Sequence, residues 1–231
     1  MGTATAPNHL SPPTSSYVEE RGTDARLCLL AEDDTYGTWG VDGVEFAMTK
    51  LGLSLAARRR FGPIEIDFSA HLDELQATGC DAVVFSGLPF HTRAVLRQAQ
   101  ARNYAPRWIV LERGWQADFA RDESLAPYLA ANVRVVAEGP AWGDESVPGM
   151  KRMLAARSQY APDQQPDLWF AYGYAQAWLA HRVLEEAVAR RDLSRAGILT
   201  TTQSLGTVDF GGLISAYSYG DGSARRRSCT H

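Results

Sequence analysis

Long apolar runs, an excess of basic residues and repeated cysteine motifs are all missing from this 231-residue sequence. No run approaches the roughly 18 apolar residues that a helix needs to cross a bilayer, so we expect no membrane-spanning segment. The net charge of -4 disfavours nucleic acid as a partner, because such a partner requires a basic face. Hydrophobic residues still make up 45% of the chain, which favours a folded core over disorder.

Cysteine is scarce, and Cys28, Cys80 and Cys229 match no metal-binding spacing. Cys28 lies inside an expected strand and Cys80 just precedes another. We therefore expect both to be buried thiols that pack as small apolar groups. A Cys28–Cys80 disulfide would require the two strands to be neighbours, which their spacing leaves open.

The N-terminus lacks both the basic and the apolar segments of a secretory signal peptide. Its proline, serine, threonine and alanine content predicts a disordered leader, followed by a helix remnant closed by Gly22. We assign residues 1–24 to these two features. Without a signal peptide, the chain is expected to be cytoplasmic if it is expressed as given.

The chain is organised around one strand-to-helix joint, residues 27–51. Residues 27–31 form an apolar run without alternation, which predicts a strand buried on both faces of a parallel sheet. Helical spacing of Val41, Val44 and Met48 follows the polar segment 32–37. Because ligands of open α/β sheets lie beyond the carboxyl ends of the strands, we expect binding near residues 32–37.

Further strands are predicted at residues 53–61, 82–86, 107–111 and 133–137, with short helices between them. This alternation predicts an α/β fold with a doubly wound parallel sheet. Right-handed crossovers place the strand-end loops on one edge. The converging loops are residues 32–37, 86–90 and 112–116.

Residues 144–205 differ, because they read as helices at 147–159, 168–190 and 195–205 with no strand among them. The second helix carries no charge from residue 168 to residue 180, so its apolar surface requires burial. Exposure would cost on the order of 1.5–3 kcal/mol for each large side chain. Either these helices pack on the first sheet, or a partner or another segment covers them.

An ordered set of motifs carries a resemblance to a known family. The segments are DDTYG at 33–37, DFSA at 67–70, TGCDAVV at 78–84, YGYAQ at 172–176 and LGTVDFGG at 205–212. In this order they resemble the type I periplasmic binding proteins, and more narrowly the branched-chain amino-acid (leucine-binding) receptors of ABC transporters. The similarity extends from about residue 17 to residue 219.

The resemblance implies two Rossmann-like lobes that close on a ligand. Residues 25–139 then form one complete lobe, residues 140–205 the returning helices of an incomplete second lobe, and residues 206–231 a C-terminal crossing segment and tail. On this plan the chain is an N-terminally truncated member. We therefore expect this chain alone to bind ligand weakly or not at all.

By the same resemblance, the protein is a non-catalytic ABC transporter substrate-binding protein for branched-chain or other hydrophobic amino acids. Its partners would be a small amino acid and, if the chain is exported, a membrane permease; the family works in the periplasm or outside the cell. No cofactor is implied. The alternative is a single-lobe regulatory or interaction module, a homodimer formed through residues 144–205.

Seven residues are the candidate ligand contacts, with Tyr36 as the best candidate for closing over the ligand. They are Tyr36, Leu88, Pro89, Phe90, Trp115, Gln116 and Tyr174. Each has a simpler interpretation as well: Tyr36 as a turn residue, Phe90 and Trp115 as apolar cover, and Tyr174 as core. Asp33 and Asp34 are expected to cap the following helix.

Enzyme signatures are missing. A phospho-accepting receiver domain needs a third aspartate after a later strand, where Ser86 and Gly87 stand instead. The five histidines show neither metal spacing nor a nucleophile motif, and we expect His91 on a helix surface. The first strand-to-helix turn lacks the glycine pattern of dinucleotide sites. We predict no catalytic and no metal-binding residues.

Overall fold

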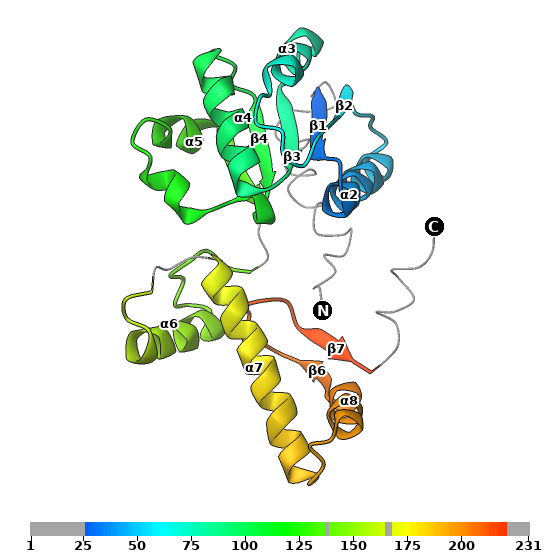
Figure 1. Cartoon of the computed structure of the whole chain (residues 1–231), viewed down its shortest axis with the longest axis vertical. Coiled ribbons are helices and arrows are strands. Elements are labelled where there is room, and N and C mark those ends of the chain that lie inside the picture. Colours follow the sequence, from blue (N-terminus) through cyan, green and yellow to red (C-terminus); the bar gives the residue numbers. More distant parts are fainter. Residues whose placement is uncertain (1–25, 137–138, 165–167, 221–231) are drawn as a thin grey trace. The chain divides into compact units, whose positions relative to one another are not determined.

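The computed structural model describes residues 26–136, 139–164 and 168–220. It divides into two compact units, Met1–Ala137 (unit 1) and Glu138–His231 (unit 2), which are described separately below. The expected leader and helix remnant at residues 1–24 lie outside the described residues. Figure 1 labels the elements of both units.

Unit 1 alternates strands and helices along the chain (Figure 1). The strands are β1 (Leu27–Glu32), β2 (Ala57–Phe61), β3 (Ala82–Ser86), β4 (Arg107–Leu111) and β5 (Val133–Val136). The helices are α2 (Thr35–Leu51), α3 (Ser69–Thr78), α4 (Pro89–Ala101) and α5 (Ala126–Asn132), with 3-10 turns η2 (Glu112–Gly114) and η3 (Ala117–Arg121). All strand pairs are parallel, in the order β2-β1-β3-β4-β5, which confirms the predicted α/β fold.

The two central strands are buried on both faces, as their unbroken apolar runs predict. Leu27 of β1 lies opposite Ala82 of β3. The edge strand β2 is shorter than the predicted 53–61, because pairing with β1 begins at Ala57. Three successive arginines, residues 58–60, leave β2 only half-buried.

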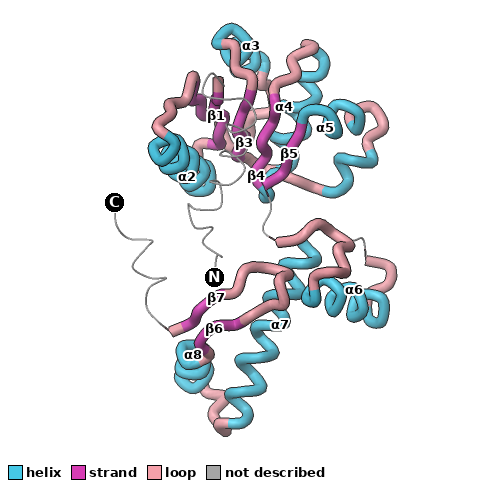
Figure 2. The backbone as a smooth tube through the Cα atoms, turned by 180° about the vertical axis from the view of Figure 1, so that it is seen from behind, coloured by secondary structure: helices cyan, strands magenta, loops and turns pink. Residues whose placement is uncertain are grey.

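Helices cover both faces of this sheet (Figure 2). On one face α3, α4 and α5 pack against the larger cluster, which includes Leu72, Leu96 and Leu129. On the other face α2 packs Val41 and Val44 against the sheet. The strand order reverses between β1 and β3, which is the topological switch point where open α/β sheets bind ligands.

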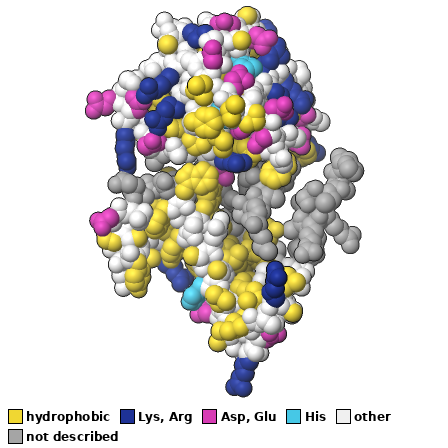
Figure 3. Space-filling model, viewed as in Figure 1, with side chains coloured by type: hydrophobic (Ala, Val, Ile, Leu, Met, Phe, Trp, Pro, Cys, Tyr) yellow, Lys and Arg dark blue, Asp and Glu magenta, His cyan; other side chains and the backbone are white. Residues whose placement is uncertain are grey.

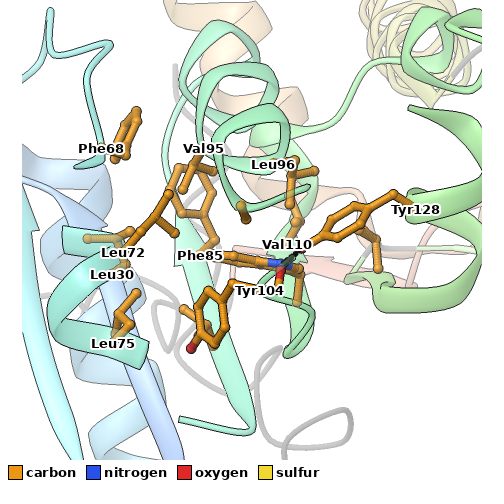
Figure 4. Packing of buried hydrophobic residues seen from close by; sticks show 14 of the residues in the cluster. Leu30, Phe68, Leu72, Leu75, Phe85, Val95, Leu96, Tyr104, Val110 and Tyr128 are labelled. Atoms are coloured by element: carbon orange, nitrogen blue, oxygen red, sulfur yellow. Dashed lines mark hydrogen bonds between the residues drawn. The ribbon is translucent and has the colours of Figure 1, made fainter. Parts of the chain in front are cut away.

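A chain of buried hydrogen bonds runs through the larger cluster at the amino ends of β3 and β4. Trp108 Nε1 donates to the Tyr128 hydroxyl at 2.9 Å, and that hydroxyl donates to the Tyr104 carbonyl at 2.6 Å. The Tyr104 hydroxyl in turn donates to the Cys80 carbonyl at 3.0 Å. Figure 4 shows Tyr104 and Tyr128 among the apolar side chains of this cluster. Buried polar groups with partners are stabilising, and these hold this end of the sheet together.

The expectation of two free thiols at Cys28 and Cys80 is wrong, because these residues form a disulfide. Their Cα atoms are 5.9 Å apart, since β1 and β3 are hydrogen-bonded neighbours. The bond joins residues separated by 52 positions in the sequence. It therefore ties the first strand to the segment that leads into the third.

The described residues of unit 2 form three helices and a two-stranded antiparallel ribbon. These are α6 (Pro148–Tyr160), α7 (Leu168–Ala189), α8 (Arg195–Ser204), β6 (Gly206–Val208) and β7 (Tyr217–Tyr219). Its core is a small cluster around Met150, Met153, Ala175 and Phe210. The described helix boundaries lie within one residue of those predicted.

Several apolar side chains of α7 are exposed among the described residues of unit 2. Ala171, Ala175, Val183 and Ala187 are buried, whereas Trp169, Leu184 and Val188 are 42%, 49% and 59% exposed. Figure 3 shows hydrophobic side chains at the surface along α7. None of the helices in the described ranges is long and apolar enough to span a membrane.

Candidate functional site

The joint between β1 and α2 places acidic groups at the carboxyl edge of the sheet. Asp34 is the N-cap of α2, and its Oδ1 accepts a hydrogen bond from the Gly37 N–H at 2.6 Å. This confirms capping for Asp34, which satisfies a helix N–H group that otherwise lacks a partner. Asp33 does not cap; it is exposed and lies 4.0 Å from Arg60. Asp34 thus has a structural role as a helix cap, whereas Asp33 is exposed to solvent.

Tyr36 connects the first and third loops of this edge. It lies in the first turn of α2 and is half-buried beside the smaller sheet cluster. The Arg113 guanidinium lies over the Tyr36 ring, with 4.7 Å between Cζ and the ring centroid. Burial is the main reason why the pKa of Tyr36 is raised, and the Glu112 charge raises it further. The Tyr36 hydroxyl is therefore neutral at physiological pH.

Glycines allow close backbone contacts between the second and third loops and within the first loop. A Cβ on Gly114 would lie 2.9 Å from the Gly87 carbonyl oxygen, so the loops after β3 and β4 are in contact. A Cβ on Gly37 would lie only 1.9 Å from the Glu32 carbonyl oxygen. Such distances leave no room for a side chain. The predicted convergence of residues 32–37, 86–90 and 112–116 is present in the structure.

His91 forms hydrogen bonds that fix the loop after β3. Its side chain is fully buried, so the prediction that it lies on a helix surface is wrong. Its Nδ1 accepts from the Leu88 N–H at 3.1 Å, and Nε2 is 3.1 Å from the Pro63 carbonyl, to which it donates. This pattern requires a neutral ring with its proton on Nε2. Burial lowers the pKa of His91, which favours the same neutral form.

Glu32 is buried beside this histidine at the end of β1. Its Oε2 lies 3.8 Å from His91 Nδ1 and has no hydrogen-bond partner in the described residues. Burial, and then the Asp34 charge, raise the pKa of Glu32. The neutral ring and the unpartnered carboxyl group lie beneath the loop that carries Leu88, instead of at a solvent-facing site.

The predicted ligand contacts in the second loop (86–90) and the third loop (112–116) differ in how exposed their side chains are. Phe90 is 45% exposed at the start of α4, and Leu88 and Pro89 are half-buried. Trp115 is half-buried, and its ring packs edge-on against Phe119 at 5.3 Å between centroids, so part of it serves the core. Gln116 is exposed.

Tyr174 belongs to unit 2, on α7. It is half-buried against the unit 2 cluster and packs edge-on against Trp178 at 6.2 Å between ring centroids. The structure therefore gathers Tyr36, Leu88, Pro89, Phe90, Trp115 and Gln116 on one edge of unit 1. It gives Tyr174 a packing contact in the other unit.

Sequence reasoning missed two side chains at the carboxyl edge. Arg113 stands over Tyr36, and Trp39, one turn further along α2, is 48% exposed. Their positions beside the predicted loops were the only available signal, because neither belongs to a recognisable motif. No group of three metal-ligating side chains occurs among the described residues. The arrangement offers aromatic surface and the guanidinium groups of Arg60 and Arg113.

Comparisons with known proteins identify the family and the fold. The family model described as periplasmic binding protein matches residues 2–228 of this chain. A search of curated proteins finds no match. Several solved structures share the fold at identities too low to transfer a ligand.

One such structure is a fatty acid ABC transporter substrate-binding protein from Thermomonospora curvata, with 20% identity and a TM-score of 0.80. The match covers 93% of this chain and 56% of that one. A branched-chain amino acid ABC transporter protein from Thermus thermophilus with bound valine has 16% identity and a TM-score of 0.68, covering 86% and 52%.

A third structure, a possible leucine/isoleucine/valine-binding protein from Rhodopirellula baltica, has 19% identity and a TM-score of 0.72, covering 93% and 58%. This chain thus spans a little more than half the length of these proteins. The family match over nearly the whole chain and the shared α/β architecture lead to one conclusion: the chain belongs to the type I periplasmic binding protein family.

Proposed function

We propose that this chain is the ligand-binding part of an ABC transporter substrate-binding protein for branched-chain or other hydrophobic amino acids. It binds its ligand between two lobes without catalysis, and the carboxyl edge of unit 1 forms one wall of the site. The observation that carries this proposal is the contact of three strand-end loops at the β1/β3 switch point.

The chemistry of this edge suits a small apolar ligand. Phe90 and Trp39 expose aromatic surface, which binds aliphatic and aromatic side chains. Two proteins of the same fold are a fatty acid ABC transporter substrate-binding protein and a branched-chain amino acid ABC transporter protein with bound valine; a fatty acid and valine both carry a carboxylate on an apolar body. Hydrophobic amino acids are our first choice because the motifs resemble that receptor group.

The disulfide supports a location outside the cytoplasm. Disulfides such as Cys28–Cys80 persist in oxidising compartments, and the family is periplasmic. We therefore propose that the protein acts in the periplasm or outside the cell and delivers its ligand to a permease.

A titration tests the proposal. Leucine, isoleucine, valine and phenylalanine are added to the purified chain and followed by calorimetry and by chemical shifts. We expect weak binding, since one wall buries only part of a ligand. Phe90→Ala should weaken it severalfold. Phe46→Ala is the matched control, because Phe46 is 43% exposed on α2 but lies near the opposite end of that helix from Tyr36.

Equal binding by Phe90→Ala and Phe46→Ala would contradict this assignment of the site. A complete lack of response to all four amino acids at millimolar concentrations would contradict the proposed function. Micromolar binding by the chain alone would overturn the expectation that it lacks part of its site.

The uncovered side of α7 favours a second candidate, the homodimeric interaction module. Leu184 and Val188 are exposed one turn apart on α7, as a self-association surface requires. Sedimentation equilibrium distinguishes the two functions. A dimer that Leu184→Glu converts to monomer, while Arg182→Glu on the other flank does not, would support the module; a monomeric wild-type chain would refute it.

A further inference from the structure

Arg113 lies at the carboxyl edge of unit 1, and its guanidinium stacks on an aromatic ring. It lies in η2, directly after β4, and is exposed to solvent. Its guanidinium lies over the Tyr36 ring at 4.7 Å. Within the ranges that the structure describes, no carboxylate forms an ion pair with it.

Two other arginines of unit 1, Arg60 and Arg93, donate side-chain hydrogen bonds within the protein. Arg60, at the same edge, donates to the Glu32 carbonyl oxygen at 2.8 Å and to Thr38 Oγ1 at 3.0 Å. Arg93 also lies over a ring, that of Phe119, but it donates to an Asp118 carboxylate oxygen at 2.7 Å. The guanidinium groups of Arg60 and Arg93 therefore already donate hydrogen bonds to other groups of the protein.

Stacking on Tyr36 orients the Arg113 guanidinium without using its N–H groups. A guanidinium carries five N–H donors in a planar fork, which matches a carboxylate in a two-point hydrogen bond. Because the fork is already oriented, less side-chain entropy is lost when an anion binds. Arg113 thus has the chemistry of a carboxylate-binding group.

Apolar surface adjoins this group. Gly114, the next residue, contacts the Gly87 carbonyl, so η2 lies directly against the loop that leads to Phe90. Trp39 and Tyr36 lie one turn apart on α2. A ligand with a carboxylate at Arg113 would have aromatic surface within reach on both neighbouring loops.

We propose that Arg113 binds the carboxylate of the ligand, and that this edge is selective for small carboxylates with an apolar body. This deepens the function proposed above and rests on it. The carboxylate can belong to an amino acid or to a short fatty acid, and the probes below distinguish these two sources.

The test follows the Arg113 side chain directly. Arginine Nε–Hε signals of the full chain are recorded by two-dimensional NMR, and Arg113 is identified by the signal missing from Arg113→Gln. Four probes are added at millimolar concentrations: leucine, its alcohol leucinol, hexanoate and 1-hexanol. We expect leucine or hexanoate to shift the Arg113 signal and both alcohols to leave it unchanged.

Arg113→Gln should lower the affinity for the active carboxylate by about fivefold or more. Arg93→Gln is the matched control, because that arginine also stacks on a ring but is ion-paired, and it should bind as the wild type does. A response to leucine alone identifies an amino-acid site, and a response to hexanoate alone identifies a fatty-acid site. Either result supports the carboxylate role.

Three results would overturn the proposal. The first is equal shifts with acid and alcohol, and the second is unchanged affinity in Arg113→Gln. The third is ligand shifts around Phe90 without movement of the Arg113 signal. The second and third leave the proposed binding function intact. If no probe perturbs any residue of unit 1, the proposed function and the role of Arg113 both fail.

Discussion

Unit 1 and unit 2 are built from similar helices but differ in what those helices cover. In the described part of unit 1, four helices pack on a five-stranded parallel sheet, and residues such as Phe85 and Trp108 are fully buried. The described part of unit 2 has a ribbon of two three-residue strands beside its helices. Its longest helix, α7, keeps Leu184 and Val188 at the surface.

The difference shows that an apolar helix does not determine its own burial. Helix α7 forms because its residues favour a helix and because one side packs on α6 and α8. Its other side packs on no sheet among the residues that the structure describes, and Leu184 and Val188 stay exposed there. Local pattern therefore predicts the helix, whereas burial depends on which other elements are present.

Removing the disulfide should give the largest difference in stability between unit 1 and unit 2. Cys28→Ala combined with Cys80→Ala should destabilise unit 1 by roughly 4 kcal/mol, because the bond restricts the unfolded chain over a separation of 52 residues. Regional hydrogen exchange should show faster exchange in residues 27–136 and little change in residues 168–220. Cys229→Ala is the control. Equal loss of protection in both units would mean that they do not unfold independently.

Replacing one glycine in each unit by alanine should change the free energy of unfolding in opposite directions. Gly37→Ala should destabilise unit 1 by about 1–3 kcal/mol, because the new Cβ would collide with the Glu32 carbonyl. Gly173→Ala should stabilise α7 by about 0.5–1 kcal/mol, because nothing lies within 4 Å of its Cβ position and alanine favours helix.

Urea unfolding monitored by circular dichroism measures both changes. A loss of stability in Gly173→Ala would show that the open side of α7 is covered in solution. A neutral effect of Gly37→Ala would contradict the tight contact between α2 and the end of β1.

The smallest expected effect is a change in pH dependence. Burial lowers the pKa of His91, so the unfolded state binds more protons as pH falls through the usual histidine range near 6.5. Unit 1 should therefore lose stability below that pH. His91→Asn cannot titrate there and retains an acceptor for the Leu88 N–H, so its profile should be flatter.

Glu32→Gln tests the neighbouring group with the opposite sign. Burial raises the pKa of Glu32, so the wild-type protein loses stability as pH rises above the ordinary glutamate range, and the variant should not. Denaturant midpoints between mildly acidic and neutral pH measure both profiles. Parallel profiles for the wild type and both variants would show that these buried groups do not control the pH response.

Much of unit 1 followed from its sequence, because parallel strands leave unbroken apolar runs. The strands 82–86 and 107–111 were predicted with the bounds that the structure has. The sequence left the disulfide open and favoured free thiols, since only the pairing of β1 with β3 brings Cys28 and Cys80 together. Strand β2 was predicted too long because its first residues lack a partner strand.

The candidate site was only partly predictable. The loops were found from strand ends, but the side chains that hold them depend on tertiary contacts. His91 was expected at a helix surface, yet the turn before α4 directs it under the loop toward Pro63. Arg113 carries no sequence signal, and its position depends on the ring of Tyr36.

The glycine contacts at the carboxyl edge have a consequence for specificity. Gly114 approaches the backbone carbonyl of Gly87, and Gly87 packs on the rings of Phe61 and Phe85, so these contacts of the loops do not use the exposed residues beside them. Phe90 and Trp39 can therefore be exchanged without moving the loops that present them. This edge is a suitable starting point for engineering new ligand selectivity, with the two glycines kept and the aromatic positions varied.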